Sequence, residues 1–289
     1  MTDIDNLQNS LPAERGYAAV ESASLVPAEA GRAGAARAGI VDELRRLLPR
    51  MSEAAGETRA ISFGIPELDF QLHRRGLAFG ALHEVTPATD DDAPAALGFI
   101  MALLGRVLPA NRASADAMLF VMPNRWHARY GQPYGHGLHC VGLDPSCVIF
   151  TQTADDKQSL WVIEEALRSS ALTAVAGVLD TLDLKTSQRL QFSARETGLP
   201  LLILRPPKTL EASAATTRWR VGAAEAARDR FDLVTHWRWR LRLERCRNGR
   251  GGEWLVEFDH VAHCFGLAAA LAGSAVPGIP VAQPDRRAG

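Results

Sequence analysis

Lysine is almost absent from this sequence. Only three lysines occur, at positions 157, 185 and 208, so 29 of the 32 basic residues are arginines and the first 156 residues contain no lysine. Acidic and basic residues nearly cancel, giving a formal net charge of −1. The chain therefore lacks the global basic field that marks many nucleic-acid-binding proteins, although a local basic surface is compatible with this composition.

Cysteine pairs and long apolar runs are also lacking. The four cysteines form no CxxC pair in a chain of 289 residues, which favours free thiols in a reducing compartment. No run of 18 or more apolar residues occurs, and the first residues lack the basic-then-apolar pattern of a signal peptide. These absences favour a cytoplasmic protein without a membrane segment.

The length suits one domain with extensions. Residues 1–37 are rich in small and polar residues without a sustained period, and we expect a disordered arm there. An apolar stripe predicts a helix at the start of residues 38–59, with a linker after it. We expect the folded core over residues 60–271 and a flexible tail over 272–289.

Within the core, apolar runs of strand length alternate with amphipathic helical segments. The strands are predicted at 81–85, 117–123, 147–152, 173–180 and 201–205. The helices are predicted at 93–108, 158–171 and 186–197. Strands that are apolar throughout are typical of a parallel sheet covered by helices on both faces.

The last part of the core has a different pattern. Residues 216–222 and 234–245 alternate polar and apolar side chains, and NGRGG at 248–252 is a hairpin signal. The sequence therefore predicts an α/β fold with a mostly parallel sheet flanked by helices and an antiparallel C-terminal extension.

Four segments resemble known proteins. ISFGIPELDFQLHRRGLAFGALHEV resembles the segment that leads into the nucleotide loop of RecA-like proteins, and LERCRNGRGGEWLVEFDHVAHCF resembles their closing hairpin. Between them, LDPSCVIFTQTADDKQSLWVIEEALRSSALTAVAGVLD, together with the later TTRWRV, resembles the ImuA family of bacterial mutagenesis cassettes. The resemblance covers roughly residues 40–270.

This resemblance implies a RecA-like fold and a role in SOS-induced, error-prone translesion DNA synthesis. It implies two partners, namely ImuB, a Y-family-like polymerase relative, and an error-prone replicative-type polymerase. It implies a structural or regulatory contribution more than a catalytic one. It leaves open whether the chain self-associates and whether a terminal segment docks on ImuB.

The position of a phosphate-binding loop carries the wrong residues for that task. A P-loop reads GxxxxGK[ST], in which glycines free the backbone N–H groups and lysine reaches the phosphates. Here no glycine lies between Ala81 and Leu97, and Asp90, Asp91 and Asp92 stand where phosphates would arrive. Each close pair of like charges costs about 1 kcal/mol in water and about 4 kcal/mol at a dielectric of about 20.

We therefore expect no ATP hydrolysis and no cofactor. The three acids fit another task better, because acidic residues at a helix N-terminus cap free N–H groups, and we expect Asp91 or Asp92 to cap the following helix. Asp180 ends an apolar strand where a Walker-B aspartate would lie, but a strand-end cap is the simpler use for it. Pro123-Asn124-Arg125 offers no carboxylate where RecA-like ATPases carry a catalytic glutamate.

A group of arginines is a candidate nucleic-acid contact. They alternate with apolar residues in TRWRV and HWRWRLRLER, so they share one face of their strands. The arginines are Arg218, Arg220, Arg238, Arg240 and Arg242. The alternative is a pair of amphipathic strands with solvated arginines, and in either case we expect the intervening tryptophans to lie in the core.

Histidines, cysteines and acids form no recognisable metal motif. Three sets contain possible ligands: His136, His139, Cys140 and Cys147; Cys246, His260, His263 and Cys264; and Asp155, Asp156, Glu164 and Glu165. Their spacing matches no common zinc or carboxylate site, and caps, surface and core positions explain them more simply. We expect no metal.

Other functions stay compatible with the sequence. One is a nucleotide- or DNA-binding regulator of the RecA superfamily, similar to a recombinase, that uses a degenerate site. Another is a direct DNA-binding module, and a third is a damage-induced inhibitor of cell division.

Overall fold

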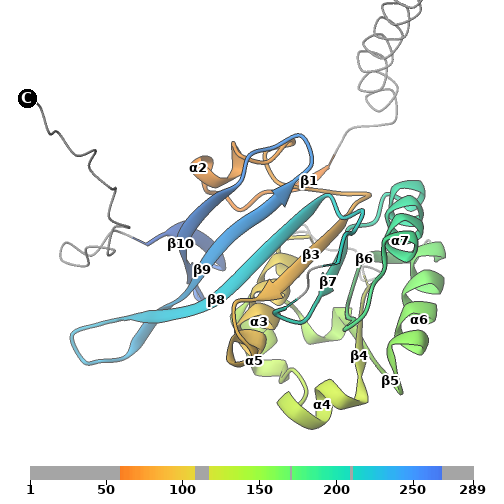
Figure 1. The fold of residues 1–289 in the computed structure, drawn as a ribbon. Helices are drawn as coiled ribbons and strands as arrows, with labels where there is room; N and C mark the ends of the chain where they lie inside the picture. Colours follow the sequence, from red (N-terminus) through yellow and green to blue (C-terminus); the bar gives the residue numbers. More distant parts are fainter. Residues whose placement is uncertain (1–58, 108–116, 170, 209–210, 269–289) are drawn as a thin grey trace, which may run out of the picture. The chain divides into compact units, whose positions relative to one another are not determined.

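A computed structural model describes residues 59–107, 117–169, 171–208 and 211–268 (Figure 1). These ranges include most of the core expected at 60–271. The disordered arm expected at 1–37, the helix expected early in 38–59 and the tail expected at 272–289 lie outside the described residues.

A nine-stranded mixed sheet forms the centre of the fold, in the order β11-β10-β9-β8-β3-β7-β6-β4-β5. Five strands make the parallel half: β3 (Leu82–Pro87), β4 (Ala117–Pro123), β5 (Val148–Thr153), β6 (Leu172–Val178) and β7 (Leu201–Leu204). Four strands make the other half: β8 (Thr217–Arg228), β9 (Val234–Cys246), β10 (Gly252–Asp259) and β11 (Cys264–Leu267).

Strand β8 is the seam between the two halves. It runs parallel to β3 on one side and antiparallel to β9 on the other. The strands from β8 to β5 are all parallel neighbours, and those from β8 to β11 are all antiparallel neighbours. The predicted α/β fold, with its antiparallel C-terminal extension, is confirmed.

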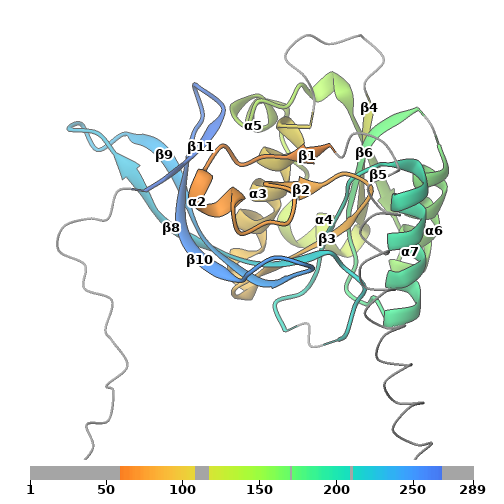
Figure 2. The same cartoon turned by 90° about the horizontal axis from the view of Figure 1, so that it is seen from above.

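Helices cover both faces of the parallel half (Figure 2). The longer ones are α3 (Ala93–Gly105), α6 (Asp156–Arg168) and α7 (Leu184–Thr197), and the shorter ones are α2 (Pro66–Asp69), α4 (Asn124–Tyr130) and α5 (Gly135–Cys140). The described ranges also contain two 3₁₀ turns, η1 (Asp90–Asp92) and η2 (Pro145–Cys147). No helix in the described ranges has the length and apolar character that crossing a bilayer requires.

The pleat of the strands divides the core into two layers. Phe120 of β4 packs in the layer that contains α3, whereas its neighbours Leu119 and Val121 pack in the layer that contains α6 and α7. The α3 layer continues under the antiparallel half and includes the fully buried Trp219. The chain thus buries alternate residues of its central strands against different helices.

A small sheet of β1 (Ala60–Ile61) and β2 (Leu77–Ala78) precedes the main sheet and is tied to it through His83. The His83 ring is fully buried, with Nε2 donating to the Ala78 carbonyl (2.9 Å) and Nδ1 accepting from the Thr217 hydroxyl (2.8 Å). Burial lowers the pKa of His83 to about 4, against a smaller opposing effect of the Ala78 bond. His83 is therefore neutral at physiological pH.

The β8–β9 hairpin extends past its neighbours (Figures 1 and 2). The last residue of β8 that pairs with β3 is Val221, and β10 ends at Asp259, opposite His236 of β9. Residues 223–236 therefore form a projection, the hairpin arm, and its outer part, from Ala227 to His236, is two-stranded.

Candidate functional site

The acidic loop (residues 86–92) joins β3 to α3 at the carboxyl edge of the parallel strands, where α/β proteins commonly bind ligands. The expected strand–loop–helix order is present, with Asp90, Asp91 and Asp92 forming η1. The Asp92 side chain turns back on the loop, where Oδ2 accepts from the Thr89 backbone N–H (3.0 Å) and hydroxyl (2.6 Å). The bond from the Thr89 N–H is the Asp92 half of a capping box on η1.

Asp92 also joins the acidic loop to the seam strand. Its Oδ1 accepts from the backbone N–H of Ala223 in β8 (2.8 Å), and the Ala88 N–H donates to the Val221 carbonyl (2.8 Å). Gly222 makes room for this contact, because a Cβ there would lie 3.3 Å from the Ala88 Cβ. The loop therefore lies directly against β8.

Three backbone N–H groups of the loop are already bonded within the protein. Ala88 donates to Val221, Thr89 donates to Asp92, and the Asp92 N–H donates to the Thr89 carbonyl (3.2 Å). A phosphate-binding loop needs such groups free and pointing at the ligand. The acidic loop opposes a bound phosphate through its charge and also through its hydrogen bonding.

Asp92 does not cap α3 with its side chain, as the sequence suggested, but bonds to the turn η1 that precedes it. Asp92 is the N-cap residue of α3 by position, but its side chain makes no capping bond to that helix. Burial tends to raise the pKa of the Asp92 carboxyl, but the bonds from Thr89 and Ala223 and the charge of Arg240 outweigh it and hold the pKa below its ordinary value. Asp90 and Asp91 are exposed.

An arginine lies between the two carboxylates at the ends of neighbouring strands. Arg125 follows β4, Asp156 follows β5, and Asp180 follows β6. The Arg125 guanidinium contacts Asp156 Oδ1 through Nη2 (2.5 Å) and Asp180 Oδ2 through Nε (2.7 Å). The Walker-B-like aspartate is thus balanced by a cation of the chain itself.

Asp156 ties this cluster to the backbone as well. Its carboxylate accepts from the N–H groups of Asp180 (3.1 Å) and Thr181 (2.9 Å). Burial works to raise the pKa of Asp156, yet the Arg125 contact and these backbone bonds lower it below its usual range. The sequence suggested a cap or a solvated helix charge for Asp156, and Asp155 is the residue that caps α6, by accepting from the Gln158 N–H (2.8 Å).

The five candidate arginines lie on strands β8 and β9, and most have an acidic partner. Arg218 contacts the fully buried Glu84 (2.7 Å), and Arg220 contacts Glu244 (2.5 Å). Both also donate to the loop after β7, Arg218 to the Glu211 carbonyl (2.9 Å) and Arg220 to the Pro207 carbonyl (2.9 Å). These two side chains are committed to contacts inside the molecule.

The three arginines of β9 differ in exposure, since the Arg238 side chain is 15% exposed and the Arg242 side chain is 62% exposed. Arg238 contacts Glu257 (3.1 Å) and Arg242 contacts Glu253 (3.2 Å), both across the pair with β10. Arg240 is exposed and has no carboxylate within ion-pair distance among the described residues. The sequence did not identify the glutamates that pair with these arginines, although their alternation in EWLVEF placed them on one strand face.

The tryptophans between the arginines lie in the core, as expected. Trp219 and Trp239 are buried, and Trp239 Nε1 donates to the Ala95 carbonyl of α3 (3.0 Å). They are therefore not available as stacking platforms for bases.

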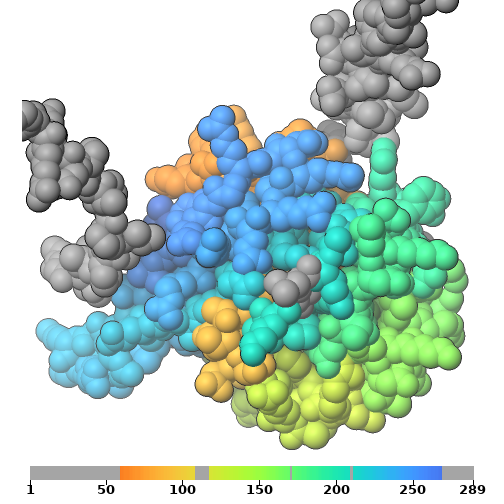
Figure 3. Space-filling view, viewed as in Figure 1, coloured from red at the N-terminus to blue at the C-terminus, as the bar shows by residue number. Residues whose placement is uncertain are grey.

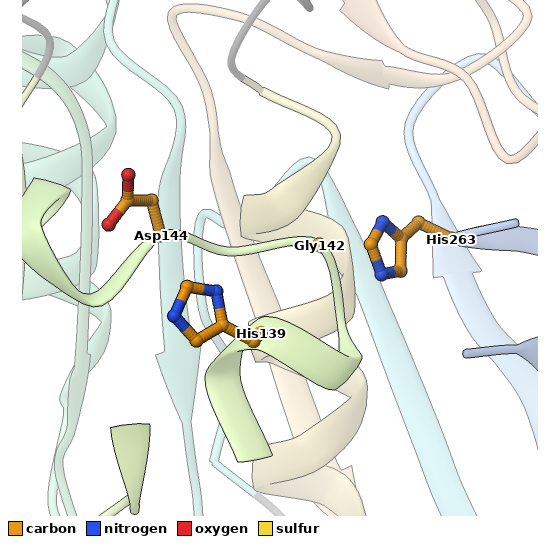
Figure 4. Close-up of a pocket in the computed structure, with 4 residues that line it drawn as sticks. All are labelled: His139, Gly142, Asp144 and His263. Carbon is orange, nitrogen blue, oxygen red and sulfur yellow. The ribbon is translucent and has the colours of Figure 1, made fainter. Parts of the chain in front are cut away.

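All twelve possible metal ligands are described, and the described part of the chain contains no group of three or more His, Cys, Asp or Glu arranged to hold a metal ion. The four cysteines are free. One residue from each histidine-containing set, His139 of α5 and His263 before β11, does line a common pocket with Gly142 and Asp144 (Figure 4).

No protein-family model matches the chain. Two curated proteins of Caulobacter vibrioides do, one from strain NA1000 / CB15N and one from strain ATCC 19089 / CIP 103742 / CB 15, each named Protein ImuA. Each is 30% identical to this chain over 247 residues, which cover 80% of this chain and 97% of the relative.

Proposed function

Since the chain belongs to the ImuA family, we propose that it is a non-catalytic accessory protein in SOS-induced, error-prone translesion DNA synthesis. In this proposal it acts in the cytoplasm with ImuB and an error-prone replicative-type polymerase. Its contribution is assembly: the core is a rigid platform on which the partners are held, and no nucleotide cycle is needed to hold them.

The observation that carries this proposal is the hydrogen bonding of the acidic loop. The N–H groups of Ala88, Thr89 and Asp92 are bonded within the protein, and the loop is joined to β8. Nucleotide binding at this edge would require those bonds to break and three carboxylates to approach the phosphates. A platform role makes use of the same bonds, because they fix the loop.

The ion cluster of Arg125, Asp156 and Asp180 supports the same proposal. A catalytic aspartate needs a metal or a water as its partner, whereas Asp180 here contacts a guanidinium. The cluster instead cross-links the ends of three strands, which stiffens the edge of the sheet.

Two measurements on purified proteins test the proposal. Tagged full-length chain should retain ImuB without nucleotide, and retention should be unchanged when Mg-ATP is added. Calorimetry with ATP should give no heat of binding at millimolar nucleotide. Absence of ImuB retention at both low and moderate salt would overturn the scaffold role.

The alternatives give different outcomes in the same experiments. A nucleotide-dependent regulator would bind ATP and lose binding on Asp180→Ala. A division inhibitor would cause filamentous growth when expressed in cells that lack ImuB. Each outcome would replace the scaffold proposal with the corresponding alternative.

A second candidate function, direct contact with DNA, has one specific observation in its favour. Arg240 has no ion-pair partner within the described residues, and Arg242 shares an exposed pair with Glu253 that separates at little cost. Replacing both by alanine should weaken single-stranded DNA binding several-fold and reduce its salt dependence. Arg168→Ala, at an exposed arginine of α6, is the matched control. Unchanged binding would exclude this face.

A further inference from the structure

The hairpin arm is supported by the rest of the sheet only at its base. Beyond His236, where β10 ends, β9 continues only to Val234, which is about 7 Å of extended chain, and residues 229–233 form the turn at the tip. Figure 3 shows this end of the hairpin standing clear of the other strands. An isolated two-stranded ribbon is marginally stable, so a tip with a defined shape needs its own internal bonds.

The polar groups of the tip supply those bonds. Asp229 Oδ1 accepts from the N–H groups of Phe231 (2.8 Å) and Leu233 (3.0 Å), and the Asp229 N–H donates to the Leu233 carbonyl (2.9 Å). Arg228 Nη1 donates to the Asp232 carbonyl (2.8 Å). The turn is thus held in one geometry before any partner arrives.

The side chains that the tip presents to solvent are apolar. Phe231 is 66% exposed, Leu233 is 64% exposed and Val234 is 40% exposed. Most exposed turns present polar side chains, whereas here the polar groups hold the turn and the apolar ones point outward. Ordered apolar residues at the end of a projection are suited to insertion into a pocket, because little conformational entropy is lost on binding.

The charge of the hairpin arm argues against a polyanionic target. Residues 223–236 contain three acids, Glu225, Asp229 and Asp232, against two arginines, Arg228 and Arg230. A net charge of about −1 does not favour DNA phosphates or an anionic membrane. The fitting target is a protein surface.

Among the described residues, the pocket next to β11 is a poor receptor for the tip of a second copy of this chain. The pocket next to β11, of about 220 Å³, is lined by His139, Gly142, Asp144 and His263. Two imidazoles and a carboxylate would lose water to an incoming phenyl ring without gaining a polar partner. This pocket offers the tip no apolar recess.

We propose that the hairpin arm is the element by which this chain docks on ImuB, with Phe231 and Leu233 inserted into an apolar pocket of that partner. This inference rests on the scaffold function proposed above and names its contact surface. Arg230, which lies over the Phe231 ring (4.7 Å), then meets a carboxylate at the rim of the pocket. A few central apolar residues carry most of the binding energy in such interfaces.

The test compares two surface variants of the full-length chain. In Phe231→Ser/Leu233→Ser the apolar tip is lost, while in Phe192→Ser a phenylalanine of similar exposure (61%) is lost from α7. With purified ImuB, the tip variant should show a Kd raised at least about tenfold, and the α7 variant a change of less than about twofold. Circular dichroism checks that both variants are folded.

A charge variant keeps the test independent of the folding of the double variant. Arg230→Glu leaves both apolar side chains in place and should weaken ImuB binding several-fold through repulsion at the rim. Equal binding of ImuB by wild type, tip variant and Arg230→Glu would overturn the hairpin-arm inference and leave the scaffold function standing.

Three other outcomes distinguish failure of the scaffold function from failure of the hairpin-arm inference. No binding of ImuB by the wild type overturns the scaffold function and the hairpin-arm inference with it. Equal weakening by the tip and α7 variants shows non-specific apolar contact and overturns the hairpin-arm inference. A wild-type dimer in sedimentation that the tip variant dissociates, without loss of ImuB binding, reassigns the hairpin arm to self-association.

Discussion

His83 is a single residue whose burial sets a pH dependence. Its folded-state pKa of about 4 lies below the ordinary value of 6.5, so its contribution to stability is complete above pH 6.5 and is lost as the pH falls toward 4. We predict that the free energy of unfolding falls by about 2 kcal/mol between pH 7 and pH 5. Urea unfolding at pH 7, 6 and 5 measures it.

The control for this prediction is His83→Gln, which keeps an amide donor and acceptor near Ala78 and Thr217 but does not titrate. This variant should show a nearly flat free energy of unfolding over the same pH range, whatever its stability at pH 7. A pH slope equal to that of the wild type would place the effect in other groups.

Arg125 gives a second prediction at the residue scale. Arg125→Ala removes the cation from Asp156 and Asp180 and should lower the free energy of unfolding by about 1 kcal/mol, because the cluster is only partly buried. Arg168→Ala, in the exposed pair with Glu165, should cost less than about 0.5 kcal/mol. Equal losses in denaturant unfolding would mean that the cluster adds no stability.

The sequence revealed the members of this cluster without their association. Asp180 was noticed because it ends an apolar strand. Arg125 was noticed only as part of Pro123-Asn124-Arg125, a tripeptide without the carboxylate that RecA-like ATPases carry there. Asp156 looked like a helix cap, since a cap is a local feature that spacing can predict. The three meet only because β5, β4 and β6 are neighbours in the sheet, and strand order is set by long-range packing.

At the scale of elements, one side chain, Asp92, adds to the backbone bonds that join the acidic loop to β8. Asp92→Ala removes the capping box and the bond from the Ala223 N–H, and should lower the free energy of unfolding by about 1 to 2 kcal/mol. Hydrogen exchange of the Ala223 amide should become faster, because its acceptor is gone.

The neighbouring Asp91 is the matched control, since it is exposed and lies in the same turn. Asp91→Ala should change neither the free energy of unfolding by more than about 0.5 kcal/mol nor the exchange of the Ala223 amide. Similar behaviour of the two variants would show that the cross-link to β8 does not hold the loop.

Elements were predictable in proportion to their length and burial. The apolar run 117–123 coincides with β4, and the amphipathic run predicted at 158–171 contains most of α6 (Asp156–Arg168). Strand β11 went unpredicted because its four residues, which include Gly266, show neither the aliphatic run of β7 nor an alternation of polar and apolar side chains. The hairpin arm was also unforeseen, because an alternating pattern does not say where a strand's neighbours end.

At the scale of the whole molecule, the bonding of the acidic loop predicts indifference to nucleotide. Mg-ATP at about 1 mM should shift the thermal unfolding midpoint by less than about 1 °C. A site with a Kd of about 10 μM would instead stabilise the fold by about 2.7 kcal/mol and raise the midpoint by several degrees. Differential scanning fluorimetry separates these results, with Mg²⁺ alone as the control.

The overall architecture followed from the change of pattern along the chain. Strands that are apolar throughout predicted the parallel half, because helices cover both faces of a parallel sheet. Strands that alternate polar and apolar residues predicted the antiparallel half, because one face of such a sheet is open to solvent. The sequence pattern did not predict which strand would join the two halves. Strand β8 joins the two halves because its apolar residues, such as Trp219 and Val221, pack with the α3 layer while its arginines face Glu84 and Glu244.

The hairpin arm is the turn end of the β8–β9 hairpin, so its length can change without altering the pairing of the rest of the sheet. The parallel strands lack this freedom, because helices and loops connect them. Residues can be added to or removed from both sides of the turn while Arg220 stays opposite Arg242 and the rest of the register is kept. Two register shifts inside the hairpin arm, after Ala224 and after Ala227, already absorb unequal strand lengths. The length of this projection and the side chains at its tip can therefore differ among relatives while the fold of the core stays the same.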